Sequence, residues 1–263
     1  MLTKDEITGI VLGKKGRKII SEKENNIGNV LIIGGERSSK TYGIVYPTLM
    51  TWKGNVFVLD RDGVLYEKVK NIRNNIIQIN LEKWDESLST LKYDDLIYSD
   101  IFVKFNIFSD KLNDKLNFIC TYFMDYYLLI ERKVTIPILF MLDNSEVINK
   151  LENIKSYLLL TKMNIKVCMC WQSLRQIEHI YENSGVTEII GLSNIIVFTD
   201  DISRNEFRTI INDGSLDKLR MISKEEVAVM KFQPNNHWAV VNYYLKVNPE
   251  KLLKKLILSN NDK

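Results

Sequence analysis

The 263-residue sequence predicts an α/β protein in which a mostly parallel sheet carries helices on both faces. Two observations lead to this fold class. Short apolar runs recur along the chain without alternating polar residues, and such runs are typical of parallel strands buried on both faces. Segments with apolar residues at helical spacing separate most of these runs, and this alternation builds a doubly wound sheet. The length fits a single domain spanning residues 1–263.

The strands are predicted from the apolar runs and the turns that bound them. The first run ends at two glycines and a polar loop, which mark a sharp turn out of the strand. The last pair of runs, 238–241 and 243–245, is predicted to form an edge of the sheet. In chain order, the other predicted strands are 30–33, 55–59, 75–79, 136–142, 165–170 and 194–198.

Helical spacing of apolar residues predicts the helices between these strands. Ser203, with Glu206 three residues later, has the pattern of a capping box and predicts a helix start at Ser203. Residues 82–109 interrupt the rhythm because they are polar with scattered aromatics, and we expect a reduced insertion or small lobe within residues 82–132. The predicted helices are 112–132, 145–163, 175–183, 203–212 and 249–258.

Charge and composition argue against several classes of protein. Thirty-six basic residues against 33 acidic ones leave a net charge of +3, too small to indicate nucleic-acid binding by bulk charge. The sequence has no uncharged apolar stretch of about 18 residues and no secretory signal, so we expect a cytoplasmic protein without a transmembrane segment of its own. The three cysteines suit a reducing compartment, and the two histidines lack the companions that a zinc site needs.

A phosphate-binding loop is predicted where the first strand turns into a helix. Such a loop reads Gly, four variable residues, Gly, Lys, then Ser or Thr; its N–H groups surround the phosphates, its lysine contacts the outer phosphates and its hydroxyl holds Mg²⁺. Ser39 replaces the second glycine, which costs about 1–2 kcal/mol if the backbone requires a positive φ. The expected cofactors are ATP and Mg²⁺, bound by Gly34, Gly35, Glu36, Arg37, Ser38, Ser39, Lys40 and Thr41.

A second strand supplies an acid for the metal. Asp143 follows the strand 136–142, so Thr41 and Asp143 are the predicted Mg²⁺-binding pair. Many ATPases of this class have a glutamate at the next position, which polarises the attacking water. Here that position is Asn144, whose neutral amide orients water but cannot accept its proton, so we expect weak hydrolysis.

Gln172 follows the strand 165–170 and is predicted to sense the terminal phosphate from the same edge of the sheet. The candidate catalytic residues are therefore Lys40, Asp143, Asn144 and Gln172. A structural interpretation stays open, in which Asp143 is a helix N-cap and Gln172 caps the helix that begins near Ser173.

Taken in order, these motifs resemble the coupling proteins of type IV secretion and conjugation, the TraG-like branch of the P-loop ATPases. Beyond the loop and the strand that ends at Asp143, the resemblance rests on Trp171-Gln172-Ser173 with Tyr181, and on segments 47–60, 65–66 and 220–227. It covers about residues 9–247. The resemblance implies a RecA-like P-loop NTPase fold and a role in conjugative DNA transfer or type IV secretion.

The chain departs from the family pattern in its chemistry and in its domain content. Ser39, Asn144 and Asp62, which stands where the family has lysine, are altered together. Family members typically carry N-terminal membrane helices and an inserted all-helical domain, and residues 82–132 are too few for such a domain. These departures predict a reduced relative that hydrolyses weakly and reaches the inner face of the cell membrane through a partner.

The resemblance also implies partners. Full-length family members are thought to form hexameric rings that pass single-stranded DNA and relaxase to the secretion channel. We therefore expect a homo-hexamer that contacts secretion and conjugation proteins, with single-stranded DNA or relaxase as cargo. The basic clusters 14–18 and 251–255 are candidate DNA contacts or simply solvated faces. Two alternatives stay open: a non-catalytic scaffold or adaptor that has lost the nucleotide, and another DNA-pumping P-loop ATPase.

Overall fold

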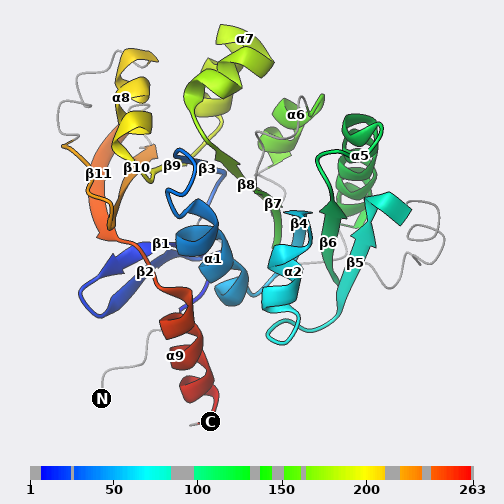
Figure 1. The fold of residues 1–263 in the computed structure, drawn as a ribbon, viewed down its shortest axis with the longest axis horizontal. Coiled ribbons are helices and arrows are strands. Elements are labelled where there is room, and N and C mark those ends of the chain that lie inside the picture. Colours follow the sequence, from blue (N-terminus) through cyan, green and yellow to red (C-terminus); the bar gives the residue numbers. More distant parts are fainter. Residues whose placement is uncertain are drawn as a thin grey trace.

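The computed structural model describes residues 7–24, 27–83, 98–130, 137–143, 151–160, 164–210, 220–232 and 238–261. In this part of the chain one 11-stranded sheet runs through the molecule in the order β2-β1-β11-β10-β9-β3-β8-β7-β4-β6-β5 (Figure 1). The strands are β1 (Ile10–Lys15), β2 (Lys18–Glu22), β3 (Val30–Ile33), β4 (Asn55–Arg61), β5 (Ile76–Asn80), β6 (Asp100–Phe105), β7 (Ile138–Leu142), β8 (Ile165–Trp171), β9 (Ile195–Phe198), β10 (Glu226–Phe232) and β11 (Trp238–Leu245).

The sheet has a parallel part and an antiparallel part. All neighbours from β9 to β5 pair in parallel, which confirms the predicted α/β class. Strands β10, β11, β1 and β2 extend this sheet in antiparallel fashion. The prediction that 238–245 forms an edge is wrong, because the N-terminal hairpin β1–β2 pairs with β11 and covers it.

Helices lie on both sides of this sheet. On one side are α5 (Leu112–Ile130), α6 (Ile154–Leu159), α7 (Leu174–Gly191) and α8 (Asp201–Ile210), and on the other are α1 (Tyr46–Thr51), α2 (Val64–Val69) and α9 (Pro249–Asn261) (Figure 1). A π-helical turn η1 (Thr41–Val45) precedes α1, and a 3₁₀ turn η2 (Leu81–Lys83) follows β5. None of the helices in the described ranges combines the length and apolarity that spanning a bilayer requires.

Two predicted helix boundaries need correction. Helix α8 begins at Asp201, so Ser203 lies in its first turn and is not the N-cap. Helix α7 continues to Gly191, well beyond the predicted end at residue 183, and bends at Glu182, whose φ of 61° is left-handed. Within the predicted helix 145–163, residues 145–150 and 161–163 lie outside the described residues.

The expected insertion falls in a range that contributes to the main body. Strand β6 lies in the sheet between β4 and β5, and α5 packs its buried side chains onto the sheet core. Residues 84–97 lie outside the described residues, so a reduced insertion or lobe within 82–132 stays a prediction.

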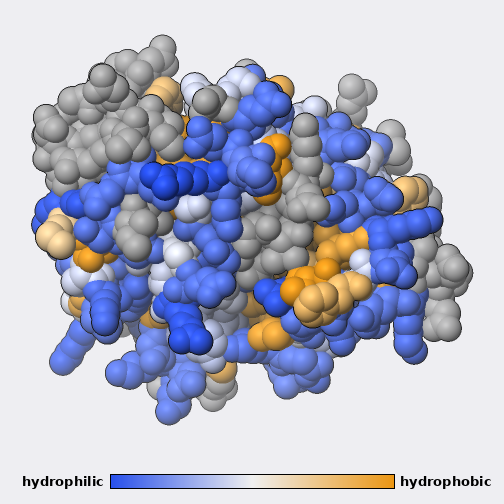
Figure 2. Space-filling view, turned by 45° about the horizontal axis from the view of Figure 1, so that its top comes forward, coloured by the Kyte–Doolittle hydropathy of each residue, from blue (hydrophilic) through white to orange (hydrophobic). Residues whose placement is uncertain are grey.

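Each central strand sends alternate side chains to two hydrophobic cores. In β3, Leu31 and Ile33 join the core beneath α5 to α8, whereas Val30 and Ile32 join the core beneath α1, α2 and α9. This alternation follows from the two-residue period of a strand and explains why the predicted strands are apolar throughout. The face turned to the viewer in Figure 2 is mostly hydrophilic, with hydrophobic residues in limited areas, as expected when the large apolar side chains are inside.

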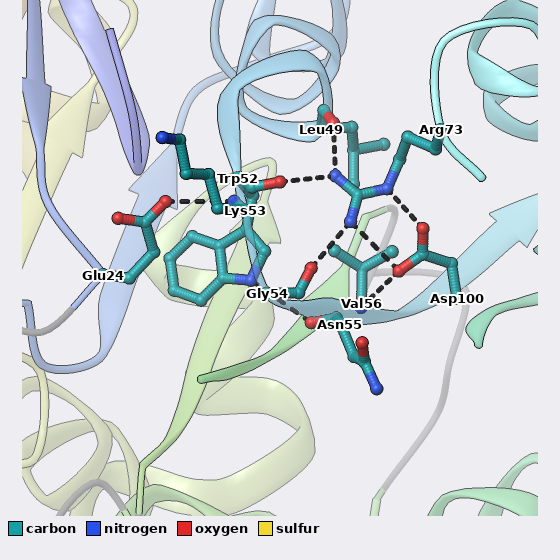
Figure 3. A network of polar contacts seen from close by, with 9 residues as sticks. All are labelled: Glu24, Leu49, Trp52, Lys53, Gly54, Asn55, Val56, Arg73 and Asp100. Carbon is teal, nitrogen blue, oxygen red and sulfur yellow. Dashed lines mark hydrogen bonds and ion pairs between the residues drawn. The ribbon is translucent and has the colours of Figure 1, made fainter. Parts of the chain in front are cut away.

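A buried guanidinium fixes the end of α1 against the sheet (Figure 3). Arg73 pairs with Asp100 at 2.6 Å, and its side chain is only 10% exposed. The same guanidinium donates to the carbonyl oxygens of Leu49, Trp52 and Gly54 at 2.7–2.8 Å. Arg73 therefore satisfies carbonyls at the helix end that have no partner within the helix.

Candidate functional site

Four neighbouring strands end at one edge of the sheet and carry the candidate site. In the order β3, β8, β7 and β4, their carboxyl ends lead into the loop 34–41, Gln172, Asp143 and Arg61. The strands are parallel and in register, with Leu142 beside both Met169 and Leu59. Ligands of open α/β sheets bind at the carboxyl ends of strands, so this edge is where chemistry is expected.

Two residues of the loop after β3 have a left-handed backbone conformation. Arg37 has φ 59° and Ser39 has φ 69°, so the serine at the predicted glycine position occupies the backbone region that glycine normally fills. The predicted strain at Ser39 is therefore present in the fold.

The strand β9 supports the loop from the side. The Thr199 hydroxyl donates to Ser38 Oγ at 2.7 Å, and the Gly35 N–H donates to the Asp200 carboxylate. A Cβ on Gly34 would lie 1.8 Å from the Thr199 hydroxyl oxygen, so only glycine fits at Gly34. The packing of β9 against β3 thus requires the first glycine of the motif.

Lys40 and Thr41 lie at the inner end of the loop. The buried Lys40 ammonium donates to the carbonyl oxygens of Gly34 and, at 3.0 Å, of Gly35, so it is folded back over its own loop. The Thr41 hydroxyl donates to Asp143 Oδ2 at 2.8 Å. The predicted metal pair is therefore in direct contact, although 102 positions separate the two residues in sequence.

The chemistry of this pair fits Mg²⁺. A hydroxyl and a carboxylate are hard oxygen ligands of the kind Mg²⁺ uses together with phosphate oxygens and waters. Asp143 is 1% exposed, so its charge is kept out of bulk water and faces the loop hydroxyl and the lysine end of the loop. A buried carboxylate in this position gains from a nearby cation.

A cavity of about 540 Å³ opens beside the loop. Its size is within the range of small-ligand sites. Loop residues 36–41 form one wall, and Tyr42, Arg61 and Gln172 complete the lining. The structure thus brings Gln172 to the loop, as the strand-end argument predicted, and adds Arg61 and Tyr42, which sequence reasoning missed.

Gln172 is held in position by the start of α7. The Gln176 side-chain amide donates to the Gln172 side-chain oxygen at 3.4 Å, and the Gln172 N–H donates to Gln176 Oε1 at 3.3 Å. The N-cap of α7 is Ser173, whose hydroxyl accepts the Gln176 N–H. Capping therefore does not require the Gln172 side chain, and this residue lines the cavity instead.

One predicted site residue, Asn144, and two arginines of the neighbouring helices α7 and α8 complete the account of this edge. Asn144 lies outside the described residues, so its role stays a prediction. Arg204 is 7% exposed and pairs with Asp201 at 3.1 Å, which ties it to its own helix. Arg175 is exposed, with its nearest described carboxylate, that of Glu206, at 3.9 Å.

Asp60 is a second buried acid at this edge. Its two carboxylate oxygens accept the N–H groups of Leu65 and Tyr66 at 2.9 and 2.8 Å, so it caps α2. Burial raises the pKa of Asp60 to about 6, and the negative charge of Asp143 adds to the rise. The turn after β4 contains two left-handed residues, Asp62 and Gly63.

Three residues at this edge could not be identified from the sequence, and for the same reason. Arg61, Thr199 and Asp200 lie at or just after strand ends but belong to no local motif. The only signal in the sequence is their place after an apolar run, and that signal becomes specific only when the strand order is known.

Comparisons with known proteins agree with this geometry. A family model described as "Type IV secretory system Conjugative DNA transfer" matches residues 3–98, and a model described as "TraM recognition site of TraD and TraG" matches residues 137–213. Together they cover about two thirds of the chain. No curated protein sequence matches.

Solved structures show the same fold at low sequence identity. The plasmid coupling protein TrwB with a non-hydrolysable ATP analogue aligns with TM-score 0.57 and 9% identity, covering 84% of this chain and 85% of that one. TrwB with ADP and Mg²⁺ aligns with TM-score 0.54 and 9% identity, and covers the same shares of the two chains. VirB4 of Thermoanaerobacter pseudethanolicus aligns with TM-score 0.61 and 10% identity, covering 93% of this chain and 98% of that one.

The structural likeness therefore shows a RecA-like P-loop ATPase fold. The family models, matched in order on either side of β6 and α5, give the relationship. This chain belongs to the TraG-like family of conjugation coupling proteins and is a coupling-protein-like ATPase domain.

Proposed function

We propose that this chain binds ATP with Mg²⁺ in the cavity beside the loop 34–41 and uses the nucleotide in conjugative DNA transfer. The observation that carries the proposal is the hydrogen bond between Thr41 and Asp143, because Thr41 and Lys40 also line the cavity. TrwB, which has the same fold, is described in complex with an ATP analogue and with ADP and Mg²⁺.

The loop residues have distinct tasks in this proposal. Thr41 and Asp143 would hold Mg²⁺, which would offset the negative charge of the phosphates. The Lys40 ammonium now donates to two loop carbonyls, and phosphate oxygens replace them on binding because charge-assisted hydrogen bonds are stronger than neutral ones. The remaining loop N–H groups surround the phosphates.

Hydrolysis is proposed to be slow. The amide of Gln172 at the cavity wall orients a water molecule but cannot accept its proton. Asn144, at the position of the expected general base, has the same limitation. The left-handed Ser39 adds a strained residue at the point where the loop meets the phosphates.

A nucleotide titration tests the binding proposal. The wild type, Lys40→Ala and, as a matched control, Lys15→Ala in the exposed hairpin are titrated with a fluorescent ATP analogue, with Mg²⁺ and with EDTA. We expect Mg²⁺-dependent binding that Lys40→Ala weakens by at least about tenfold and Lys15→Ala leaves unchanged. A wild type that binds no better than Lys40→Ala would reject the proposal and favour the scaffold alternative.

Turnover and DNA are tested in a second assay. ATP hydrolysis is measured for the wild type, Ser39→Gly and Asn144→Glu, with and without single-stranded DNA. We expect low wild-type turnover that Asn144→Glu raises by at least about tenfold, since a positioned general base contributes 10²–10⁴-fold. Stimulation by single-stranded DNA, together with a ring-sized oligomer in mass photometry, would support the proposed motor. No stimulation and a monomer would restrict the proposal to nucleotide binding within a secretion or conjugation complex.

A further inference from the structure

Arg61 lines the same cavity as the loop that carries Lys40 but comes from a different strand end. It is the last residue of β4, and β4 pairs in parallel with β7, whose end leads into Asp143. The strand order β3-β8-β7-β4 therefore places Asp143, at the end of β7, between the loop after β3 and Arg61 at the end of β4. Resting on the proposed ATP binding, we propose that Arg61 binds the terminal phosphate of the triphosphate and makes the site favour ATP over ADP.

The position of the metal pair supports the choice of phosphate. Mg²⁺ in P-loop ATPases bridges the β- and γ-phosphates. In the proposed complex the loop would surround the phosphates from the β3 side, so the Arg61 guanidinium on the β4 side of Asp143 would meet the outer end of the triphosphate. ADP lacks this outer phosphate, and its contacts lie with the loop.

The backbone of Arg61 is fixed, while its side chain is available. Arg61 pairs with Phe105 in the parallel ladder to β6, and the next N–H, of Asp62, donates to the Phe105 carbonyl oxygen at 2.9 Å. The Arg61 side chain is 39% exposed, and its ion pair with Asp62 is 3.5 Å long on a carboxylate that is 53% exposed. Exposed ion pairs of this kind contribute little to stability, so a phosphate group can replace the Asp62 carboxylate as the partner of Arg61.

Guanidinium chemistry fits this role. Arginine stays protonated and presents a planar fork that binds two phosphate oxygens at once. Arg73 and Arg204 are 10% and 7% exposed and hold buried or local carboxylates, so they are committed elsewhere. In the described cavity lining, Arg61 supplies the arginine from outside the loop.

Equilibrium binding tests this role without relying on turnover. Affinities for a non-hydrolysable ATP analogue and for ADP, both with Mg²⁺, are measured by calorimetry for the wild type, Arg61→Ala, Arg61→Lys and the hairpin control Arg17→Ala. We expect Arg61→Ala to lower the affinity for the ATP analogue by about ten- to hundredfold and the affinity for ADP by less than about threefold. Arg61→Lys should fall between, because lysine keeps the charge but not the fork.

A second variant separates phosphate binding from a structural role. Asp62→Asn removes the competing carboxylate, and asparagine tolerates the left-handed φ of 60° at this position. It should keep or strengthen binding of the ATP analogue. If Arg61→Ala lost equal affinity for the ATP analogue and for ADP, or lost affinity for neither, the inference would be overturned. Failure of the proposed function is distinct, because the wild type and Lys40→Ala would then fail to bind either nucleotide.

Discussion

Ser39 carries a backbone conformation that its side chain disfavours, with φ 69° at the position of the second glycine of the motif. Replacing it by glycine removes about 1–2 kcal/mol of strain. The greater freedom of glycine in the unfolded chain offsets roughly 0.4–1 kcal/mol of this gain. We therefore predict that Ser39→Gly raises the free energy of unfolding by up to about 1.5 kcal/mol, measured by urea denaturation without nucleotide.

The neighbouring serine provides the matched control for Ser39→Gly. Ser38 has no left-handed φ to relieve, and its hydroxyl oxygen accepts the Thr199 hydroxyl in a buried hydrogen bond. Ser38→Gly should therefore destabilise the protein by about 1 kcal/mol or more. If both variants were equally destabilised, the strain at Ser39 would have no energetic weight.

Asp60 gives the protein a pH dependence with an unusual sign for a carboxyl group. Burial raises its pKa to about 6 from 3.8, so between about pH 4 and 6 the folded state holds a proton that the unfolded state has released. The stabilisation is complete below the unfolded pKa and is lost as the pH rises through the folded pKa. From pH 4.5 to 7 we predict a loss of about 2 kcal/mol, since one pKa unit corresponds to about 1.4 kcal/mol and the shift spans roughly two units, part of which lies below pH 4.5.

Denaturation at pH 4.5, 6 and 7 in EDTA measures this loss. It should be absent in Asp60→Asn and present in the control Asp125→Asn, which removes an exposed carboxylate from α5. The hydrogen bonds of Arg220 lower the pKa of Glu226 to about 2, so the stabilisation from Glu226 is lost only as the pH falls below about 4.5. A wild type and Asp60→Asn with parallel pH profiles would refute the assignment.

At the scale of elements, Arg73 joins α1, the turn before β4 and the start of β6 (Figure 3). Arg73→Ala leaves Asp100 as a buried charge and three carbonyls without this donor, so we predict a loss of about 3–5 kcal/mol in the free energy of unfolding. Arg73→Lys should recover only part of this free energy, because an ammonium group cannot reach all four acceptors.

The exposed pair Lys70–Glu67, close in sequence, is the control for Arg73. Lys70→Ala should leave the urea midpoint nearly unchanged because solvent screens this pair. Comparable losses in Arg73→Ala and Lys70→Ala would mean that the buried network contributes no more than a surface contact.

The elements also show what a sequence can and cannot predict. The parallel strands other than β6, the loop and the approach of Asp143 to Thr41 were predictable, because a strand end followed by Gly-rich or acidic residues is a local signal. Strand β6 (Asp100–Phe105) was not predicted, since it lies in the polar range that was expected to form an insertion. The pairing of β1–β2 with β11 was not, since it joins the two ends of the chain and depends on sheet order. Arg61 and Asp200 were missed for the same reason.

At the scale of the whole molecule, the sheet separates two cores that share every central strand. Trp171 lies in the core beneath α5 to α8, and Trp52 lies in the core beneath α1, α2 and α9, so two indoles report on opposite faces. Adjacent residues of one strand pack into different cores, as Leu31 and Ile32 do, so losing one core removes the support of the other.

We therefore predict one cooperative unfolding transition for both faces. Two variants, each keeping only Trp52 or only Trp171 of the four tryptophans, are unfolded in urea and followed by fluorescence and by far-ultraviolet circular dichroism. The fluorescence midpoint of each variant should coincide with its own dichroism midpoint, and the urea dependence of the two variants should be equal. A Trp52 transition that precedes loss of secondary structure would show that the face bearing α1, which follows the loop 34–41, opens on its own. The loop could then close around a ligand independently of the core beneath α5 to α8.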